Sequence, residues 1–173
     1  MKNSIANLSL FCLLMILTNC SKTKNKSNHI TFNFDELKNW NISNEAITDK
    51  FSRSGKYSIF VNPDREFSLT YESNMNDLLA KGYTKLTAVI WIKIVEPLKE
   101  SQWVASVNSH TGANYVWKST PFTSAKETDA KGWKRVEIKL DLPLIAKDGV
   151  LKIYGWSPTK EEVILDDFEL IFE

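Results

Sequence analysis

Apolar and polar residues alternate along most of the chain from His29 onward, and this period of two is the strongest constraint on the fold. In the stretch 29–36 (HITFNFDE), Ile30, Phe32 and Phe34 alternate with polar residues. Successive side chains of a β-strand point to opposite faces, so segments of this kind form strands with one buried face and one solvated face. The pattern therefore predicts a protein built from antiparallel sheets.

About nine short segments carry this alternation, and only 75–82 (MNDLLAKG) is a candidate helix. The other expected strand regions are 56–62 and 66–72 as a hairpin across Pro63-Asp64-Arg65, 85–96, 103–120 as two strands, 134–142, 150–156 and 163–172. Many short strands separated by polar turns are typical of sandwiches and barrels. We expect an all-β, antiparallel β-sandwich (jelly roll) of about nine strands that forms one domain, residues 29–173.

The first twenty residues resemble an export signal. Lys2 is the only charge, and an apolar stretch from Leu8 to Leu17 precedes Cys20. That stretch has about half of the ~20 residues that a membrane-spanning helix needs, which favours a cleaved signal. The sequence Leu17-Thr18-Asn19-Cys20 resembles the lipobox of bacterial lipoproteins, although Asn19 stands where Gly or Ala is usual. The alternative is an ordinary secretory signal that ends near a cysteine.

The lipobox resemblance implies that residues 1–19 are removed and that Cys20 carries the acyl chains, palmitate among them. Residues 20–28 then form the lipidated cysteine and a flexible tether with a reach of roughly 15 Å, so the partner that the resemblance predicts is a membrane. Surface export of similar lipoproteins is associated with acidic residues after the cysteine, whereas Ser21 and Lys22 follow here. We therefore expect a lipid-anchored protein of the bacterial cell envelope, on the outer membrane and facing the periplasm.

Cysteine content and charge exclude several functions. Cys12 leaves with the signal and Cys20 is lipidated, so the folded domain has no thiol for cysteine proteases, redox chemistry or Cys-ligated zinc. The whole chain has 22 basic and 21 acidic residues. This balance gives no support for a nucleic-acid partner.

Catalytic patterns are weak. His29 and His110 are expected at the surface, and no nucleophile elbow, phosphate loop or H-E-x-x-H motif is present. The acids at 161–162 and 166–167 could form a glycosidase pair, but alternation places Asp166 on the core face and Asp167 on the opposite face. We therefore expect no enzymatic activity, with a polysaccharide-degrading enzyme as the least favoured alternative.

Several motifs together resemble one family over nearly all of residues 30–172. They are F-N-F-D (32–35), Trp40, S-R-S-G-K-Y-S (52–58), W-I-K (91–93), Y-G-W-S-P (154–158) and V-I-L-D-D-F-E-L (163–170). This set is similar to the galactose-binding-like jelly rolls of bacterial carbohydrate-binding modules. In many of these a structural calcium is held at positions that match Asp35, the Gly55 region and Asp166. The alternative is that Asp166 accepts backbone N–H bonds from the N-terminal loop.

Aromatic residues are the other candidates, because sugars stack on exposed rings beside hydrogen-bonding side chains. The predicted ligand-binding residues are Trp91, Trp117, Tyr154 and Trp156, with Tyr115 as a weaker companion and Lys93, Gln102 and Asn108 as possible donors. Trp40, Trp103 and Trp133 are expected to anchor the core or loops. Two hypotheses stay open for the exposed rings: they bind a glycan, or they contact a protein as part of an envelope complex.

Overall fold

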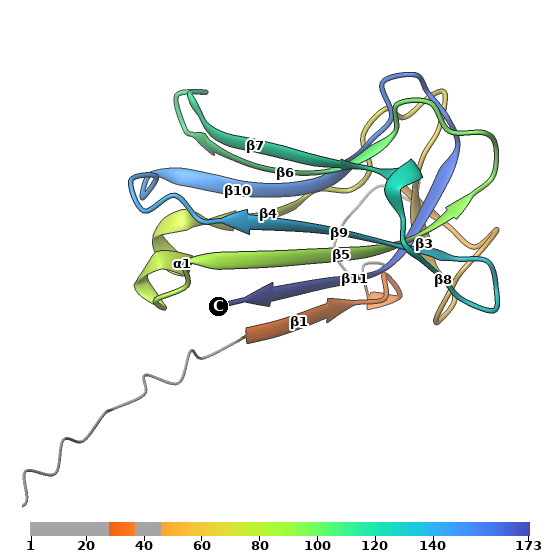
Figure 1. Cartoon of the computed structure of the whole chain (residues 1–173), viewed down its shortest axis with the longest axis horizontal. Coiled ribbons are helices and arrows are strands. Elements are labelled where there is room, and N and C mark those ends of the chain that lie inside the picture. The colour runs from red at the N-terminus through yellow and green to blue at the C-terminus, as the bar shows by residue number, and fades with distance from the viewer. Residues whose placement is uncertain (1–27, 37–45) are drawn as a thin grey trace, which may run out of the picture.

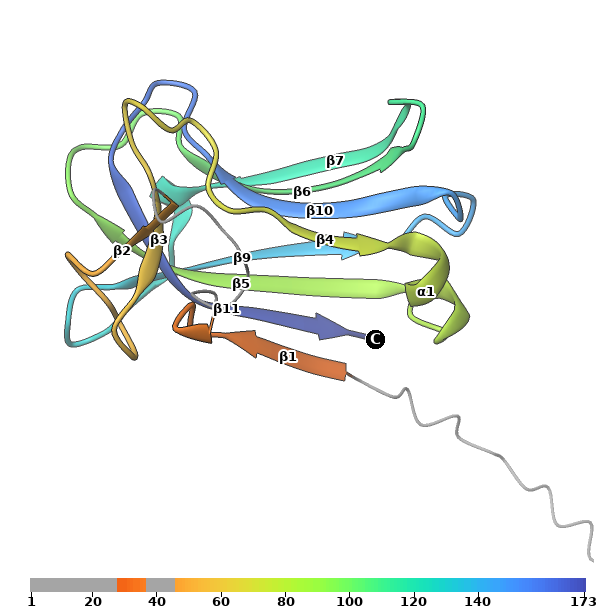
Figure 2. The same ribbon diagram turned by 180° about the vertical axis from the view of Figure 1, so that it is seen from behind.

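The computed structural model describes residues 28–36 and 46–173. Two antiparallel sheets face each other in a β-sandwich, seen from one side in Figure 1 and from behind in Figure 2. The larger sheet has seven strands in the order β2-β3-β11-β5-β9-β8, with β1 paired to β11, and the smaller sheet has four in the order β4-β10-β6-β7. The predicted all-β antiparallel sandwich is confirmed.

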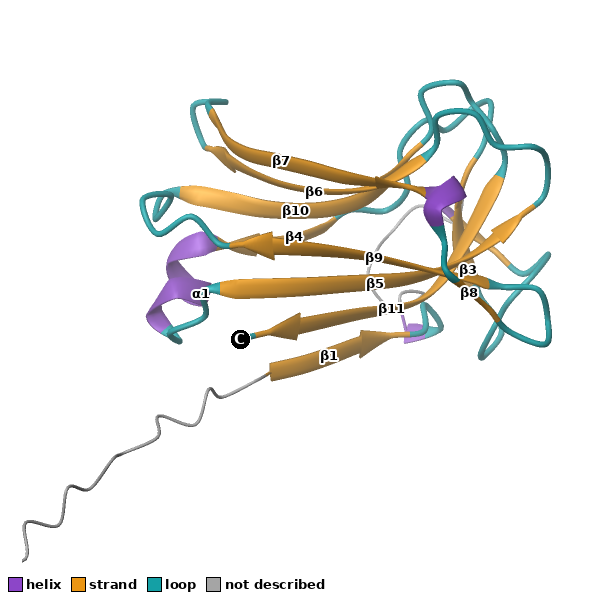
Figure 3. Ribbon diagram, in the orientation of Figure 1, coloured by secondary structure: helices purple, strands orange, loops and turns teal. Residues whose placement is uncertain are grey.

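Strands dominate the described residues, and helix α1 lies at one end of the sandwich (Figure 3). The elements are β1 (Asn28–Phe32), β2 (Ile47–Thr48), β3 (Ser58–Val61), β4 (Tyr71–Asn74), α1 (Met75–Ala80), β5 (Lys85–Ile94), β6 (Gln102–Ser109), β7 (Asn114–Pro121), a 3₁₀ helix (Phe122–Ser124), β8 (Glu127–Thr128), β9 (Lys134–Asp141), β10 (Gly149–Trp156) and β11 (Val163–Phe172). The predicted helix is confirmed. The described part has eleven strands, two more than the predicted nine. The two additional strands, β2 and β8, have only two residues each.

One predicted hairpin is wrong. Asn62 and Arg65 do exchange backbone hydrogen bonds of 2.9 and 3.0 Å and so form the expected turn. The following segment then leaves the larger sheet, because Ser68 donates its amide to the carbonyl of Gly155 at the end of β10. Strand β4 continues along β10 in the smaller sheet, so β3 and β4 lie in different layers.

The core lies between the two sheets and is filled by alternate residues of their strands. Ala88, Ile90 and Ile92 of β5 are buried in it, as is Trp103 of β6, which is 2 % exposed. Trp133, just before β9, is buried to the same degree, so the prediction of anchoring roles for both tryptophans is confirmed. Each fully buried Leu or Ile contributes roughly 1.5–3 kcal/mol, which makes this inner layer the main source of stability.

Strand β11 is interrupted by a bulge at the paired aspartates. Its register against β5 shifts between Asp166 and Glu169, and Asp167 has a positive φ of 48°. The core therefore receives Val163 and Leu165 before the bulge but Phe168 after it. The expectation that Asp166 lies on the core face is wrong, because Asp166 pairs with the outward-facing Trp91 and the extra residue of the bulge reverses the alternation between Leu165 and Phe168.

The predicted signal (1–19), Cys20 and Trp40 lie outside the described residues, as does the tether up to residue 27. Within the part that the structure describes, no helix is long and apolar enough to cross a membrane. The described chain starts at β1, whose Asn28 pairs with Phe172 near the C-terminus.

Candidate functional site

The outer face of the smaller sheet carries the candidate site. On β10, Leu151 and Ile153 point into the core, so alternation turns Tyr154 and Trp156 outward. Trp117 of β7 lies opposite Ser106 of β6 and also faces outward. The smaller sheet is curved, and this outer face is on the inside of the curve (Figures 1 and 2).

Four rings meet on this face, and we call them the aromatic cluster: Phe67, Trp117, Tyr154 and Trp156. Phe67 and Trp156 are nearly parallel, with centroids 6.3 Å apart and planes at 3°. Trp117 stands at 84° to Trp156 with centroids 6.3 Å apart, and Tyr154 meets Phe67 edge-on at 5.8 Å. Phe67 and Trp117 are 48 % and 45 % exposed, so the cluster presents ring surface to solvent. The sequence interpretation missed Phe67, whose signal is an isolated bridge to Trp156 that only the fold reveals.

Trp156 is held in place by polar contacts. Its indole Nε1 donates to Oε1 of Glu66 at 2.7 Å, and the neighbouring Ser157 amide donates to the Glu66 carbonyl at 2.8 Å. The backbone of β10 can lie close to Leu165 because Gly155 has no side chain. A Cβ at this position would be only 2.8 Å from Leu165 Cδ2. The indole orientation is therefore fixed before any ligand arrives.

A polar hollow of about 550 Å³ continues the same outer face toward the other end of the sheet. It is lined by Glu72, Ser73, Asn74, Asn108, Ser109, His110, Val150 and Lys152. Lys152 Nζ pairs with Glu72 Oε1 at 2.8 Å across β10 and β4. Asn108, a predicted donor, lines this hollow, and Gln102 pairs in register with Trp156. The face thus combines rings at one end with amide and charged groups at the other.

Trp91 does not belong to this face. It lies on β5 in the larger sheet, where Asp166 and Arg135 are its cross-strand neighbours. The guanidinium of Arg53 covers its ring at 3.8 Å. Lys93 lies on the same strand and donates to the Lys131 carbonyl at 2.7 Å. The prediction that Trp91 joins Tyr154 and Trp156 is wrong. Alternation predicts which residues of a strand face away from the core, but not which of the two sheets the strand joins.

Tyr115 is set apart from the cluster by a second irregularity. The register of β6 and β7 shifts between Val107 and Asn108, which leaves Tyr115 unpaired beside the shift. Its hydroxyl donates to Asp148 Oδ1 at 2.7 Å, and this hydrogen bond raises the pKa of Tyr115. Tyr115 therefore ties the β6–β7 hairpin to the start of β10.

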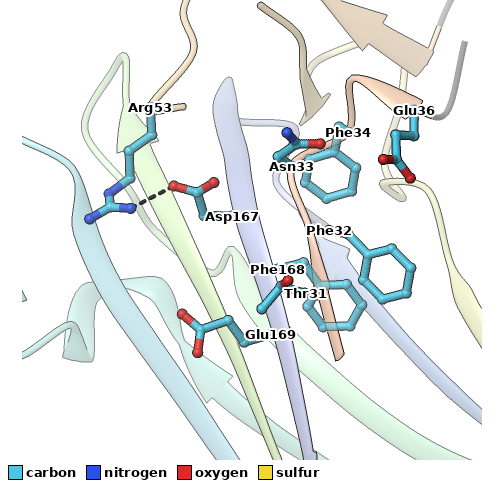
Figure 4. A pocket seen from close by; sticks show the side chains of 9 residues that line it. All are labelled: Thr31, Phe32, Asn33, Phe34, Glu36, Arg53, Asp167, Phe168 and Glu169. Atoms are coloured by element: carbon cyan, nitrogen blue, oxygen red, sulfur yellow. Dashed lines mark hydrogen bonds and ion pairs between the residues drawn. The ribbon is translucent and has the colours of Figure 1, made fainter. Parts of the chain in front are cut away.

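The two aspartates of β11 converge on one loop. Asp166 is fully buried, and its Oδ2 accepts the amides of Arg53 at 2.6 Å and Ser54 at 3.2 Å. Asp167 accepts Arg53 Nη1 at 2.5 Å and also contacts the Ser54 hydroxyl. Figure 4 shows the Arg53–Asp167 pair beside a pocket of about 380 Å³. The expectation that Asp166 and Asp167 serve opposite faces is wrong, because the bulge aims both at residues 53–54.

Asp35 fastens the other side of the same loop. Its Oδ1 accepts the amides of Lys56 and Tyr57, each at 2.8 Å. Gly55 has a positive φ of 61°, and a Cβ there would lie 2.1 Å from Asp35 Oδ2, so only glycine fits this turn.

A calcium ion needs six to eight oxygen ligands. The geometry matches the hypothesis that Asp166 accepts backbone N–H bonds from a loop, and Asp35 accepts two amides of the same loop. Among the described residues no group of three or more His, Cys, Asp or Glu side chains is arranged to hold a metal. The carboxylates thus fit a loop fastened by amides, which does not need the calcium implied by the resemblance to hold it.

The other two acids of the glycosidase hypothesis, Glu161 and Glu162, are also engaged by protein groups. Glu161 is buried and accepts hydroxyl hydrogens from Ser101 and Thr159, both at 2.5 Å, and from Ser157 at 2.9 Å. Burial opposes its ionisation, but these hydroxyls prevail and lower the pKa of Glu161 to about 2. Glu162 pairs with Lys50 Nζ at 3.0 Å. The lowered pKa of Glu161 is the opposite of the raised pKa that a general acid at neutral pH needs.

The two histidines lie at the surface as predicted. His29 is exposed and its Nε2 lies 3.2 Å from Glu169 Oε2. His110 is exposed in the β6–β7 turn and borders the polar hollow.

No protein-family model matches the chain, and comparison with curated proteins finds no match. Among solved structures the chain is similar to the CBM22-1 xylan-binding domain of Xyn10C from Paenibacillus barcinonensis, with 12 % identity, coverage of 73 % of this chain and 78 % of that one, and a TM-score of 0.45. It is also similar to CBM27-1 of Caldicellulosiruptor saccharolyticus in complex with mannohexaose (12 % identity, 82 % and 96 % covered, TM-score 0.41). A cyclase from Fischerella sp. TAU has 11 % identity, coverage of 89 % and 78 %, and a TM-score of 0.40. Identities and TM-scores this low assign no ligand to this chain. Its function therefore has to be inferred from its own side chains.

Proposed function

We propose that the domain binds carbohydrate without catalysis, on the outer face of the smaller sheet. The observation that carries the proposal is the aromatic cluster beside the polar hollow on one curved face. Sugars present flat C–H surfaces bordered by hydroxyls, so they need ring faces next to hydrogen-bonding groups. Phe67, Trp117 and Trp156 supply the rings, and Trp156 is already oriented by Glu66.

The dimensions of the face favour an oligosaccharide over a single sugar. From Val150 in the hollow to Trp156 in the cluster, β10 spans six residue steps, roughly 20 Å at ~3.3 Å each. Asn108 and Lys152 can donate to hydroxyls, and Glu72 can accept from them. A chain of several sugar units would stack at one end and form hydrogen bonds at the other.

The proposal includes membrane attachment through lipid at Cys20, on the outer membrane facing the periplasm. The supporting feature is the lipobox-like sequence that ends at Cys20. The absence of catalysis is proposed because Glu161, Asp166 and Asp167 all accept hydrogen bonds from protein donors.

The test is binding of the chain from Ser21 on, without signal and lipid, to a glycan array and then to the best glycan by calorimetry. Trp156→Ala should weaken binding at least tenfold, about 1.4 kcal/mol, because the stacking surface is lost. Trp91→Ala is the matched control, since it removes the same side chain from the other sheet and should leave affinity unchanged. Glycan binding that survives Trp156→Ala, or no glycan binding at all, would contradict the proposal and favour a protein partner.

A further inference from the structure

The turn between β9 and β10 exposes two adjacent aliphatic side chains. Leu144 and Ile145 are 62 % and 82 % exposed, the highest values among the large apolar residues that the structure describes. The turn itself is well formed, because Ala146 donates its amide to Pro143 and Gly149 donates to Ala146, at 3.0 and 2.9 Å. A defined turn therefore presents apolar groups that the domain itself leaves uncovered.

This turn lies at the end of the sandwich where the described chain begins. Leu142 donates its amide to Thr84 at 2.8 Å, and Thr84 donates to the C-terminal Glu173 at 2.6 Å. Asn28, the first residue of β1, pairs with Phe172 at the same end. Figures 1 and 2 show α1, the C-terminus and the start of β1 together there.

We propose that the tip Leu144–Ile145 inserts into the headgroup region of the bilayer to which the chain is anchored. This inference rests on the lipid at Cys20 in the proposed function. The eight residues from Cys20 to Ser27 reach roughly 15 Å, which holds this end of the domain against the lipid surface. Exposed Leu and Ile gain by leaving water for the interfacial region, and a bilayer held this close is the apolar phase within reach.

Charge does not drive this contact. Charges of both signs lie close to the tip in the chain, Asp141, Lys147 and Asp148, and Lys85 pairs in register with Asp141. The insertion should therefore persist on neutral phosphatidylcholine and be insensitive to salt.

The orientation has a consequence for the glycan face. From Gly149 beside the tip to Trp156, β10 spans seven residue steps, roughly 23 Å. The aromatic cluster is therefore held away from the headgroups, whereas the polar hollow, which is lined by Val150, lies at the membrane end of the glycan face.

The experiment uses the full lipidated chain in phosphatidylcholine vesicles that contain brominated lipids. A fluorophore is attached through Lys147→Cys, next to the tip, or through Asp64→Cys in the turn after β3. The fluorophore at position 147 should be quenched severalfold more strongly than at 64, at both low and high salt. The double variant Leu144→Ser, Ile145→Ser should remove this difference, whereas Val95→Ser, an exposed aliphatic residue elsewhere (41 % exposed), should not.

Equal quenching at 147 and 64 would overturn the inference, as would quenching at 147 that survives the double variant. A mass spectrum showing Cys20 without acyl chains would overturn it too. Glycan binding is measured on the same samples and does not involve the tip. Loss of tip quenching with intact glycan binding rejects only the membrane contact, and the reverse result rejects only the glycan site.

Discussion

The outer faces of the two sheets both carry outward-pointing tryptophan, but their surroundings differ. On the larger sheet, Arg53 covers Trp91 and pairs with Asp129 and Asp167, and we call these residues with Asp166 the closed cluster. On the smaller sheet, Trp156 stacks beside Phe67 with nearly half of the Phe67 side chain in solvent. One face satisfies its side chains internally, and the other leaves ring surface available.

The difference comes from one loop. Residues 53–57 are fastened over β11 by Asp35 on one side and Asp166 on the other, which brings the Arg53 guanidinium onto Trp91. The same alternation of strand residues thus produces a structural tryptophan on one sheet and a candidate binding residue on the other. Changes in the closed cluster should alter stability, and changes in the aromatic cluster should alter binding.

Acid should stabilise the closed cluster. Burial raises the pKa of Asp166 to about 6 from 3.8, against the opposing effect of the loop amides, and the neighbouring Asp167 charge adds to the rise. Between these values the folded state holds a proton that the unfolded state has released, so stability falls as pH rises from about 4 to 6. We expect this group alone to contribute a decrease of up to about 3 kcal/mol in the free energy of unfolding, measured by urea denaturation across that range.

The Asp166→Asn variant isolates this effect because it cannot titrate. Its stability relative to the natural chain should improve as pH rises from 4 to 6, and a constant difference would contradict the raised pKa. Glu161 acts in the opposite sense at lower pH. Its pKa is lowered from 4.5 to about 2, so the stability it contributes is present above 4.5 and is lost as pH falls toward 2.

Arg53→Ala should have the next largest effect. It leaves Asp129 and Asp167 without their guanidinium and uncovers Trp91, and we expect a loss of about 2 kcal/mol because these side chains are only partly shielded from water. Glycan affinity should not change. Arg65→Ala is the matched control, since its guanidinium lies 6.0 Å from the Phe60 ring, and it should cost less than about 0.5 kcal/mol. Equal losses for the two variants in urea denaturation would refute the role of the closed cluster.

Alternation predicted the fold well because it reports which residues each strand buries. The aliphatic residues of β5 and the outward direction of Tyr154 and Trp156 follow directly from it. Alternation contains no information on how strands are assigned to sheets, since that depends on contacts between distant segments. Trp91 was therefore grouped with Trp156 although the two lie on different sheets.

The bulge in β11 was beyond the same reasoning. In a strand with regular alternation, Asp166 and Asp167 would point to opposite faces. The bulge, with its positive φ at Asp167, lets both carboxylates accept hydrogen bonds from Arg53. Aspartate tolerates this conformation better than most residues, so an Asp-Asp pair inside an apolar strand is a weak sequence signal of a bulge.

Phe67 and Phe51 provide a sharper test of the difference between the two faces. The two side chains are similarly exposed, at 48 % and 39 %, but Phe67 belongs to the aromatic cluster and Phe51 lies in the segment before Arg53. Phe67→Ala should reduce glycan affinity about tenfold by calorimetry, because a sugar loses one of two parallel rings. Phe51→Ala should leave affinity unchanged. Equal effects of the two substitutions would mean that general surface apolarity, and not the cluster, determines binding.

Calcium removal should have the smallest effect. Asp35 and Asp166 already direct their carboxylate oxygens at amides of the loop, so the loop can stay closed without a cation. We expect the melting temperature to be the same in EDTA and in millimolar calcium. A bound calcium present at a hundredfold its Kd would stabilise the fold by about 2.7 kcal/mol, which for a domain of this size is roughly 5 to 10 °C. A shift of that size, lost in Asp35→Asn, would show that the loop amides share these carboxylates with an ion.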